Sequence, residues 1–118
     1  MPRGLWKPLE TVVSQCQAYA KSLGFSVKLV SGYRSLAEQA EIYRSRKKSP
    51  YPVARPGLSQ HNYGLAVDLS TSPRTRHSLV VDFMVSHGVS WGGVTDPNHF
   101  QVIPASIWMA VINSAEQG

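Results

Sequence analysis

Two histidines and two aspartates stand at spacings that suit a catalytic metal ion. His61 and Asp68 lie seven positions apart across a turn-forming segment, and Asp96 and His99 lie three positions apart further along the chain. Three protein ligands with a fourth position left open are typical of a catalytic zinc rather than a structural one. Two histidines and one aspartate supply such a set. The second carboxylate, beside His99, is what the site needs to take a proton from water at the metal.

Simpler explanations have to be weighed against a metal site. A histidine near an aspartate is more often an ordinary surface or core pair. A shared metal also requires a chain reversal, because a fully extended chain would hold His61 and Asp68 roughly 23 Å apart. Glycines stand at both turns and tolerate the positive φ that a reversal needs, so the joint arrangement favours the metal. His77 and His87 lack comparable neighbours, and we expect them to be solvated on a helix surface.

Length and charge limit the possible classes of protein. The 118 residues fit one domain, residues 1–118. The net charge of +5 favours attraction to polyanions, such as nucleic acid, phospholipid surfaces or the anionic polymers of a bacterial envelope. Residues 1–8 lack the apolar region of a signal peptide, and no stretch approaches the ~20 apolar residues of a membrane span. We expect synthesis in the cytoplasm, unless an export signal lies outside this sequence, and no integral membrane association.

A basic cluster at residues 44–48, joined by Arg55, has two interpretations. It either attracts the chain to an anionic envelope or is a solvated helix end. A nucleic-acid-binding role is disfavoured, because the cluster is short and no aromatic platform for stacked bases surrounds it. We therefore expect no nucleic-acid partner.

Hydrophobic periodicity and turn residues predict a mixed order of helices and strands. Ser35 followed by Glu38 is the signature of a capping box at the start of one helix. Cys16, the single cysteine, falls on the apolar side of another and should be a buried structural thiol. The apolar run 107–112 suits a packed helix. The order indicates an α+β fold, a small antiparallel sheet with flanking helices. The predicted helices are 8–23, 35–46, 72–88 and 104–114, and the predicted strands are 25–30, 65–69, 89–91 and 99–102.

The most specific signal joins three motifs. They are Ser59-x-His61-x-x-Gly64-x-Ala66-x-Asp68, then Asp96-x-x-His99-Phe100, and upstream Ser31-Gly32-Tyr33-Arg34-Ser35 with Glu38-Gln39. Together they resemble the zinc peptidases of bacterial cell-wall peptide stems. That group includes D-Ala-D-Ala carboxypeptidases and dipeptidases, L-alanyl-D-glutamate endopeptidases and many phage endolysins. Its zinc fold is shared with hedgehog signalling domains. The resemblance covers about residues 9–103 and implies this hedgehog/D-Ala-D-Ala-peptidase-like fold.

The resemblance implies a role for each residue of the metal constellation. His61, Asp68 and His99 correspond to the zinc ligands, so Zn²⁺ is the expected cofactor. Asp96 corresponds to the general base, which later returns the proton to the leaving amine. Hydrolysis would then follow attack by zinc-bound hydroxide.

Four further side chains are implied at the substrate-binding site. Arg34 corresponds to the family's arginine. Its guanidinium would bind the substrate carbonyl or oxyanion, since it stays charged and offers a directed fork. A structural salt bridge is the alternative for that residue. Trp91 is as well explained by core packing. Ser59 and Gln39 would support the site by hydrogen bonds.

The resemblance implies a metallopeptidase acting on the peptide stems of bacterial peptidoglycan. The short chain predicts an open cleft, which favours an endolysin-like, monomeric endopeptidase of the L-alanyl-D-glutamate type. One alternative is a D,D-carboxypeptidase that removes the terminal D-alanine. Another is a non-catalytic zinc-containing binding module, against which Asp96 and Arg34 argue. Without a visible signal peptide, we expect the protein to reach the wall during phage or prophage lysis.

Overall fold

Four short strands form an antiparallel sheet in the computed structural model, which describes residues 4–117. Residues 1–3, part of the segment inspected for a signal peptide, lie outside the described residues. The order across the sheet is β1-β2-β4-β3, so the last two strands of the chain extend the sheet from β2. The predicted α+β class with a small antiparallel sheet is confirmed. The strands are β1 (Ser26–Ser31), β2 (Ala66–Ser72), β3 (Ser90–Trp91) and β4 (His99–Gln101).

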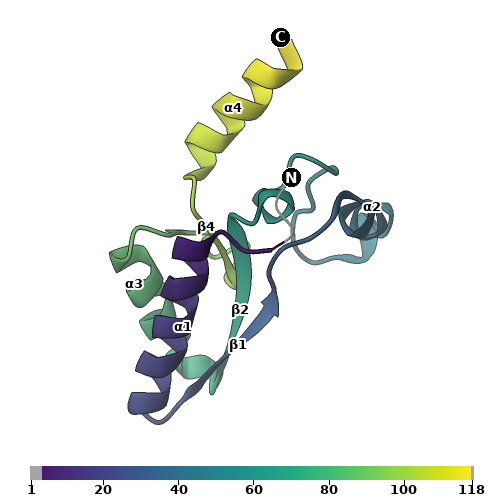
Figure 1. Cartoon of the computed structure of the whole chain (residues 1–118). Coiled ribbons are helices and arrows are strands. Elements are labelled where there is room, and N and C mark those ends of the chain that lie inside the picture. Colours follow the sequence, from purple (N-terminus) through teal and green to yellow (C-terminus); the bar gives the residue numbers. More distant parts are fainter. Residues whose placement is uncertain (1–3, 118) are drawn as a thin grey trace.

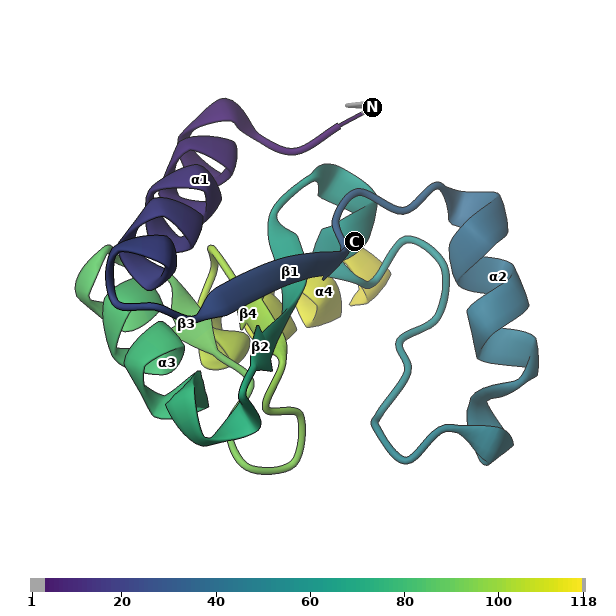
Figure 2. The same cartoon turned by 90° about the horizontal axis from the view of Figure 1, so that it is seen from below.

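The described residues also form four α-helices: α1 (Lys7–Ser22), α2 (Leu36–Arg44), α3 (His77–Ser86) and α4 (Ala105–Gln117). Helices α1 and α3 lie side by side on one face, whereas α2 stands apart on the other side (Figures 1 and 2). The core lies between the helical pair and the sheet. Its buried side chains include Leu9, Val13, Cys16 and Ala20 of α1, Val80 and Met84 of α3, and Val67, Leu69 and Phe100 of the strands.

Cys16 is a core residue, as its position on the apolar side of a helix predicts. Its side chain is fully buried and makes no disulfide. Burial raises the pKa of the thiol to about 11, because the charged thiolate is poorly solvated there. Cys16 is therefore a protonated packing residue at neutral pH.

Strand alternation separates the core from the polar face of the sheet. Val67 and Phe100 are Cα partners between β2 and β4, and both are fully buried in the core. The next pair along, Asp68 and His99, must point to the opposite face, because successive side chains of a strand alternate. That face is turned away from α1 and α3, and it carries the candidate metal site.

The third helix begins later than the sequence predicts. Residues 65–69 were expected to be the whole strand and residue 72 to open the helix. Instead β2 continues through Thr71 and Ser72, which pair with Val27 and Ser26 of β1. A 3₁₀ turn, Arg74–Arg76, follows before α3 starts at His77. The partner strand supplies backbone hydrogen bonds that a local apolar pattern cannot reveal.

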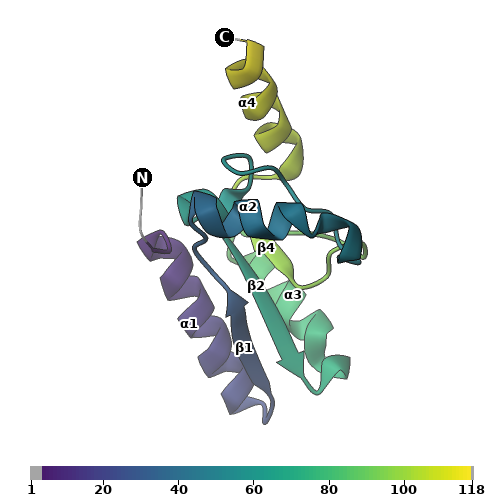
Figure 3. The ribbon, with the colours of Figure 1, turned by 90° about the vertical axis from the view of Figure 1, so that its right-hand side faces the viewer.

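The C-terminal helix also differs from expectation, because α4 projects away from the body (Figures 1 and 3). Ile107, Met109 and Val111 are 54%, 54% and 49% exposed, so the prediction of a packed helix is wrong for these side chains. The Cα radius of gyration is 14.4 Å, against about 13.5 Å for a compact chain of this length. Helix α4 is attached through Trp108, whose indole N–H donates to the Leu58 carbonyl at 2.8 Å.

The described helices were also compared with the dimensions of a bilayer. Within residues 4–117, none combines the length and the apolar character needed to cross a membrane.

Candidate active site

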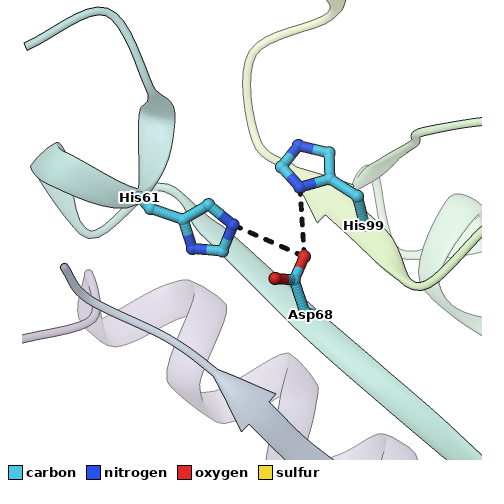
Figure 4. Close-up of side chains that lie close together, drawn as sticks. All are labelled: His61, Asp68 and His99. Carbon is cyan, nitrogen blue, oxygen red and sulfur yellow. Dashed lines mark hydrogen bonds and ion pairs between the residues drawn. The ribbon is translucent and has the colours of Figure 1, made fainter. Parts of the chain in front are cut away.

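A 3₁₀ turn and two paired strands bring the three candidate ligands together. Asp68 on β2 and His99 on β4 are Cα partners. His61 lies in the 3₁₀ helix Gln60–Tyr63, which ends at Gly64 with a left-handed φ of +71°. The reversal expected from the glycine is therefore present. It returns the chain so that His61 and Asp68 face each other, as Figure 4 shows.

The ligand atoms are spaced as a metal ion requires. One donor atom from each of His61, Asp68 and His99 lies within 4.8 Å of the others. Oδ1 of Asp68 is 3.4 Å from Nε2 of His61 and 3.2 Å from Nδ1 of His99. Tetrahedral zinc with bonds of about 2.0–2.1 Å separates its ligands by about 3.3 Å. Among the described residues, this is the one group of three such side chains within reach of one ion.

Hydrogen bonds on the far side of each ring set the protonation of the two histidines. His61 Nδ1 lies 2.8 Å from the Gly32 carbonyl, an acceptor only, so Nδ1 carries the proton. His99 Nε2 lies 2.7 Å from Gln101 Oε1, and the Gln101 amide nitrogen donates to the Ile103 carbonyl at 2.9 Å. His99 Nε2 is therefore also protonated. In the neutral form of both rings, the unprotonated nitrogens then face the Asp68 carboxylate.

Three electron pairs consequently converge on one point, which only a cation can stabilise. This donor set, with two imidazole nitrogens and one carboxylate, fits zinc. The sequence motifs did not single out Gln101. The signal was present, however, because residues two apart on a strand share a face and β4 places Gln101 beside His99.

Arg34 contacts the site through three of its nitrogens. Its Nη2 is 2.9 Å from Asp68 Oδ2, its Nε donates to Ser31 Oγ at 3.0 Å and its Nη1 to Gln39 Oε1 at 3.3 Å. The backbone is fixed as well, since the Arg34 amide donates to the His61 carbonyl at 3.0 Å. The salt bridge weighed against a substrate-binding role is thus present. Arg34 also lines the cleft, so the two roles are compatible.

Burial and charge shift the carboxyl groups in opposite directions. Burial favours neutral Asp68, but His61 and His99, when their rings are protonated, outweigh it and hold the pKa of Asp68 far below its usual range. For Asp96, burial is the largest cause and raises the pKa, with repulsion from Asp68 in the same direction. Asp68 is therefore ionised as a ligand must be. Asp96 is shifted toward the range where a carboxylate accepts protons near neutral pH.

His99 has its pKa raised for a related reason. Burial opposes its charge, but the hydrogen bonds to Asp68 and Gln101 favour it. The Asp68 carboxylate therefore stabilises a cation at Nδ1 of His99, whether that cation is a proton or a metal ion.

The three candidate ligands and Asp96 line one open cleft of about 610 Å³. Side chains of α4, including Trp108 and Met109, line this cleft, and so do Ser49 and residues 51–55. Asp96 lies in the loop between β3 and β4 and enters the cleft beside His99. The expected combination of a three-ligand set and a neighbouring carboxylate is thus assembled in space.

Of the remaining predicted site residues, Ser59 and Gln39 line the cleft and also support it by hydrogen bonds. Ser59 accepts a hydrogen bond from the His61 amide at 3.2 Å. Gln39 is 1% exposed and links Arg34 to the Ala54 carbonyl, to which it donates at 2.8 Å. Trp91 packs against the core and lines a smaller hollow next to Asp96.

One histidine is placed differently from its prediction. His77 is 8% exposed, so the expectation of a solvated histidine is wrong for it. It lies at the first turn of α3, where Thr71 and the loop after Asp96 enclose its ring. His87, at the other end of the helix, is exposed as expected.

Comparison with known proteins agrees with this geometry. Residues 3–98 match the VanY family, D-alanyl-D-alanine carboxypeptidases. The peptidoglycan L-alanyl-D-glutamate endopeptidase CwlK of Bacillus subtilis (strain 168) is 30% identical over 112 residues, covering 75% of this chain and 67% of that protein.

Solved structures show the same fold. The L-Ala D-Glu endopeptidase ChiX of Serratia marcescens superposes with a TM-score of 0.64 at 24% identity, over 86% of this chain and 82% of that one. A mutant of the vancomycin resistance D,D-pentapeptidase VanY, in complex with Zn(II), gives 0.66 at 18% identity, over 92% and 78%. The expected family and fold are confirmed. Since the family match covers most of its length, this chain belongs to the VanY D-alanyl-D-alanine carboxypeptidase family and is a peptidoglycan peptidase.

Proposed function

We propose that this chain is a zinc-dependent endopeptidase that cleaves the peptide stem of peptidoglycan at an L-alanyl-D-glutamate bond. The observation that carries the zinc site is the convergence of three electron pairs, from His61, Asp68 and His99, at the base of an open cleft. Their spacings of 3.2 and 3.4 Å suit tetrahedral zinc. A zinc ion held by these three residues would act as a Lewis acid and would lower the pKa of water toward neutrality.

Asp96 is the group we assign to proton transfer. Its carboxylate lies in the same cleft as the ligands without belonging to the group of three. It accepts the proton of the attacking water and then donates it to the departing nitrogen. The raised pKa of Asp96, caused mainly by burial, supports both steps, because it brings the carboxyl closer to neutral pH.

Arg34 has donors left for the substrate. A guanidinium carries five N–H groups, and the contacts to Ser31, Gln39 and Asp68 use three of them. The other two are free to donate to the oxygen that gains charge on the scissile carbonyl. We therefore assign Arg34 two roles, holding the Asp68 carboxylate and stabilising the oxyanion.

The endopeptidase assignment is supported by the similarity to CwlK and by the open cleft. A polymeric substrate needs a path past the metal on both sides, and no enclosed chamber is required. The family description favours a second candidate, a D,D-carboxypeptidase that releases terminal D-alanine. Both activities use the same residues, so they differ in which part of the stem the cleft holds.

We further propose action at the cell wall as a monomer. Lys47 and Lys48 in the 3₁₀ turn after α2 are exposed, which supports attraction to anionic wall polymers. Delivery during phage or prophage lysis is the route that we infer.

Digestion of purified peptidoglycan, read by mass spectrometry, tests the proposed bond. The expected products are stem peptides with a new N-terminal D-glutamate and glycan chains that retain L-alanine. Free D-alanine as the only product would instead establish the carboxypeptidase. Asp96→Asn serves as the matched inactive control, and an unchanged digest with the wild-type chain would overturn the proposal.

A further inference from the structure

The carbonyl next to the proposed base accepts hydrogen bonds from two side chains. His77 Nε2 lies 2.6 Å from the oxygen of Pro97, and Trp91 Nε1 lies 2.8 Å from the same oxygen. Pro97 directly follows Asp96 in the chain. The two donors come from different elements, the first turn of α3 and the end of β3. A carbonyl oxygen has two lone pairs, so this pair of donors satisfies it completely.

The ring of His77 is held in the form that donates. Its Nδ1 is 2.7 Å from the hydroxyl of Thr71, and both residues are buried. Since the Pro97 carbonyl can only accept, the proton resides on Nε2, and the Thr71 hydroxyl donates to Nδ1. Burial is also the main reason why the pKa of His77 is lowered, which agrees with a neutral ring.

The backbone next to Asp96 has few groups through which it can be held. Pro97 has no N–H, so its own backbone can form a hydrogen bond only through its carbonyl. On either side the backbone is already tied, since the Asp96 amide donates to Gly93 at 3.1 Å and the Leu69 amide to the Asn98 carbonyl at 2.9 Å. The Asp96 carbonyl also accepts from the His99 amide at 3.1 Å. The Pro97 carbonyl lies between these attached residues, so its two donors hold the middle of the segment that follows Asp96.

We propose that His77 and Trp91 are positioning residues, which hold the Asp96 carboxylate at its working place by binding the Pro97 carbonyl. The inference rests on the proposed role of Asp96 as base. Neither side chain needs to contact the substrate. Proton transfer depends steeply on geometry, and a displacement of about 1 Å can cost about a hundredfold in rate. Side chains that orient the ligands of a metal typically contribute about 10- to 100-fold, and we expect a contribution of similar size here.

The test compares variants that remove one donor each. Trp91→Phe keeps a ring against the core and loses the N–H, and His77→Leu replaces the imidazole with an apolar side chain. The expected result is a kcat lowered about 10- to 100-fold for the double variant, with KM and zinc content unchanged. His77→Gln can still donate to Pro97 and accept from Thr71, so it should recover most of the rate. His87→Leu, on the exposed end of the same helix, is the matched control.

A double-mutant cycle separates positioning from general stability. In an Asp96→Asn background, His77→Leu and Trp91→Phe should cause no further loss of the residual rate, because the group they position is gone. If they lower the rate equally with and without Asp96, they act on the fold and the inference is overturned. If His77→Leu does not fold, Trp91→Phe and His77→Gln still decide between the outcomes.

The two proposals fail in distinguishable ways. A wild-type chain that cleaves no peptidoglycan would overturn the proposed function and this inference together. An active wild type that loses activity in Asp96→Asn, but keeps full kcat in the folded double variant, would overturn the positioning role alone.

Discussion

Each histidine of the candidate metal site is fixed by the partner of its second nitrogen. The Gly32 carbonyl fixes His61 and the Gln101 side chain fixes His99, and both leave an electron pair facing Asp68. Such outer partners orient a ligand ring and set its tautomer before any metal arrives. Asp68 is held similarly, because Arg34 occupies its second oxygen at 2.9 Å. The three ligands are therefore held in place before a metal binds. Their remaining electron pairs face one another and are best stabilised by a cation.

Replacing Gln101 tests this preparation. Gln101→Leu removes the acceptor for His99 Nε2, so the ring can turn or take the other tautomer. Zinc affinity should fall about 10- to 100-fold, measured by competition with a chromophoric chelator. Gln17→Leu is a matched control, since Gln17 donates to a backbone carbonyl of β1, Val27, and contacts no ligand. Equal zinc affinity in Gln101→Leu and the wild type would show that the ring needs no such partner.

Replacing Arg34 tests the two roles assigned to its guanidinium. Arg34→Lys keeps the charge but loses the planar fork. We expect the fold and zinc content to survive and kcat to fall about 10²–10³-fold, the usual effect of removing one oxyanion donor. Arg44→Lys, in an exposed ion pair with Glu41, is the control. A wild-type rate for Arg34→Lys would reduce Arg34 to a structural partner of Asp68.

Hydrogen bonds to two distant segments hold the turn that carries His61. The turn Gln60–Tyr63 is fastened to the segment before α4, because the Gln60 side chain both donates to and accepts from the Ile103 backbone, at 2.6 and 2.9 Å. Its end at Gly64 touches the N-terminal segment, where the Trp6 amide donates to the Gly64 carbonyl at 2.9 Å. Strand pairing places the other two ligands. The site thus depends on one turn and one strand pair meeting correctly.

Gly64 is the residue at which a substitution would most easily disturb the contact between this turn and the N-terminal segment. A Cβ there would lie 2.3 Å from the Gly4 carbonyl oxygen, and φ is +71°. Gly64→Ala should destabilise the fold by roughly 1–3 kcal/mol through backbone strain, with an added contribution from the clash. Thermal unfolding measures this change, and chelator competition should show weaker zinc binding because His61 shifts with the turn.

Gly24→Ala provides the matched control for that experiment. Gly24 has a similar φ of +82°, but a Cβ there meets nothing within 4 Å. It should therefore show the strain alone and leave zinc affinity unchanged. Equal destabilisation in both variants would contradict a tight approach at Gly64.

In the whole molecule, the candidate active site lies on the face of the sheet opposite helices α1 and α3. Helices α1 and α3 cover one face of the sheet, and α4 projects beyond the sheet (Figure 3). The cleft is lined by Asp68 and His99, whose side chains lie on the other face. Sequence periodicity anticipated most of this arrangement. Residues 65–69 were predicted to form the strand that carries Asp68, and Gly64 predicted the reversal before it. Local patterns sufficed there because the local chain itself forms the structure.

The sequence was less informative where distant contacts decide. Thr71 and Ser72 are polar, so only their pairing with β1 reveals that the strand continues. His77 looked solvated because its partners, Thr71 and Pro97, come from other elements. The apolar run of α4 predicted burial, but the helix attaches through Trp108 and leaves Ile107 exposed. In each case the deciding contact is remote in the chain.

Zinc content and turnover, measured on the same samples of wild type and Asp96→Asn, test the assignment of the ligands and the base most directly. Asn is close to Asp in size, so the fold should survive and about one zinc per chain should remain on His61, Asp68 and His99. The amide cannot accept a proton, so peptidoglycan hydrolysis should fall by at least about 10²–10⁴-fold. His61→Ala, as a control, should lose zinc and activity together. Loss of zinc from Asp96→Asn in parallel with activity would make Asp96 a ligand, and full zinc with undiminished turnover would remove it from the chemistry.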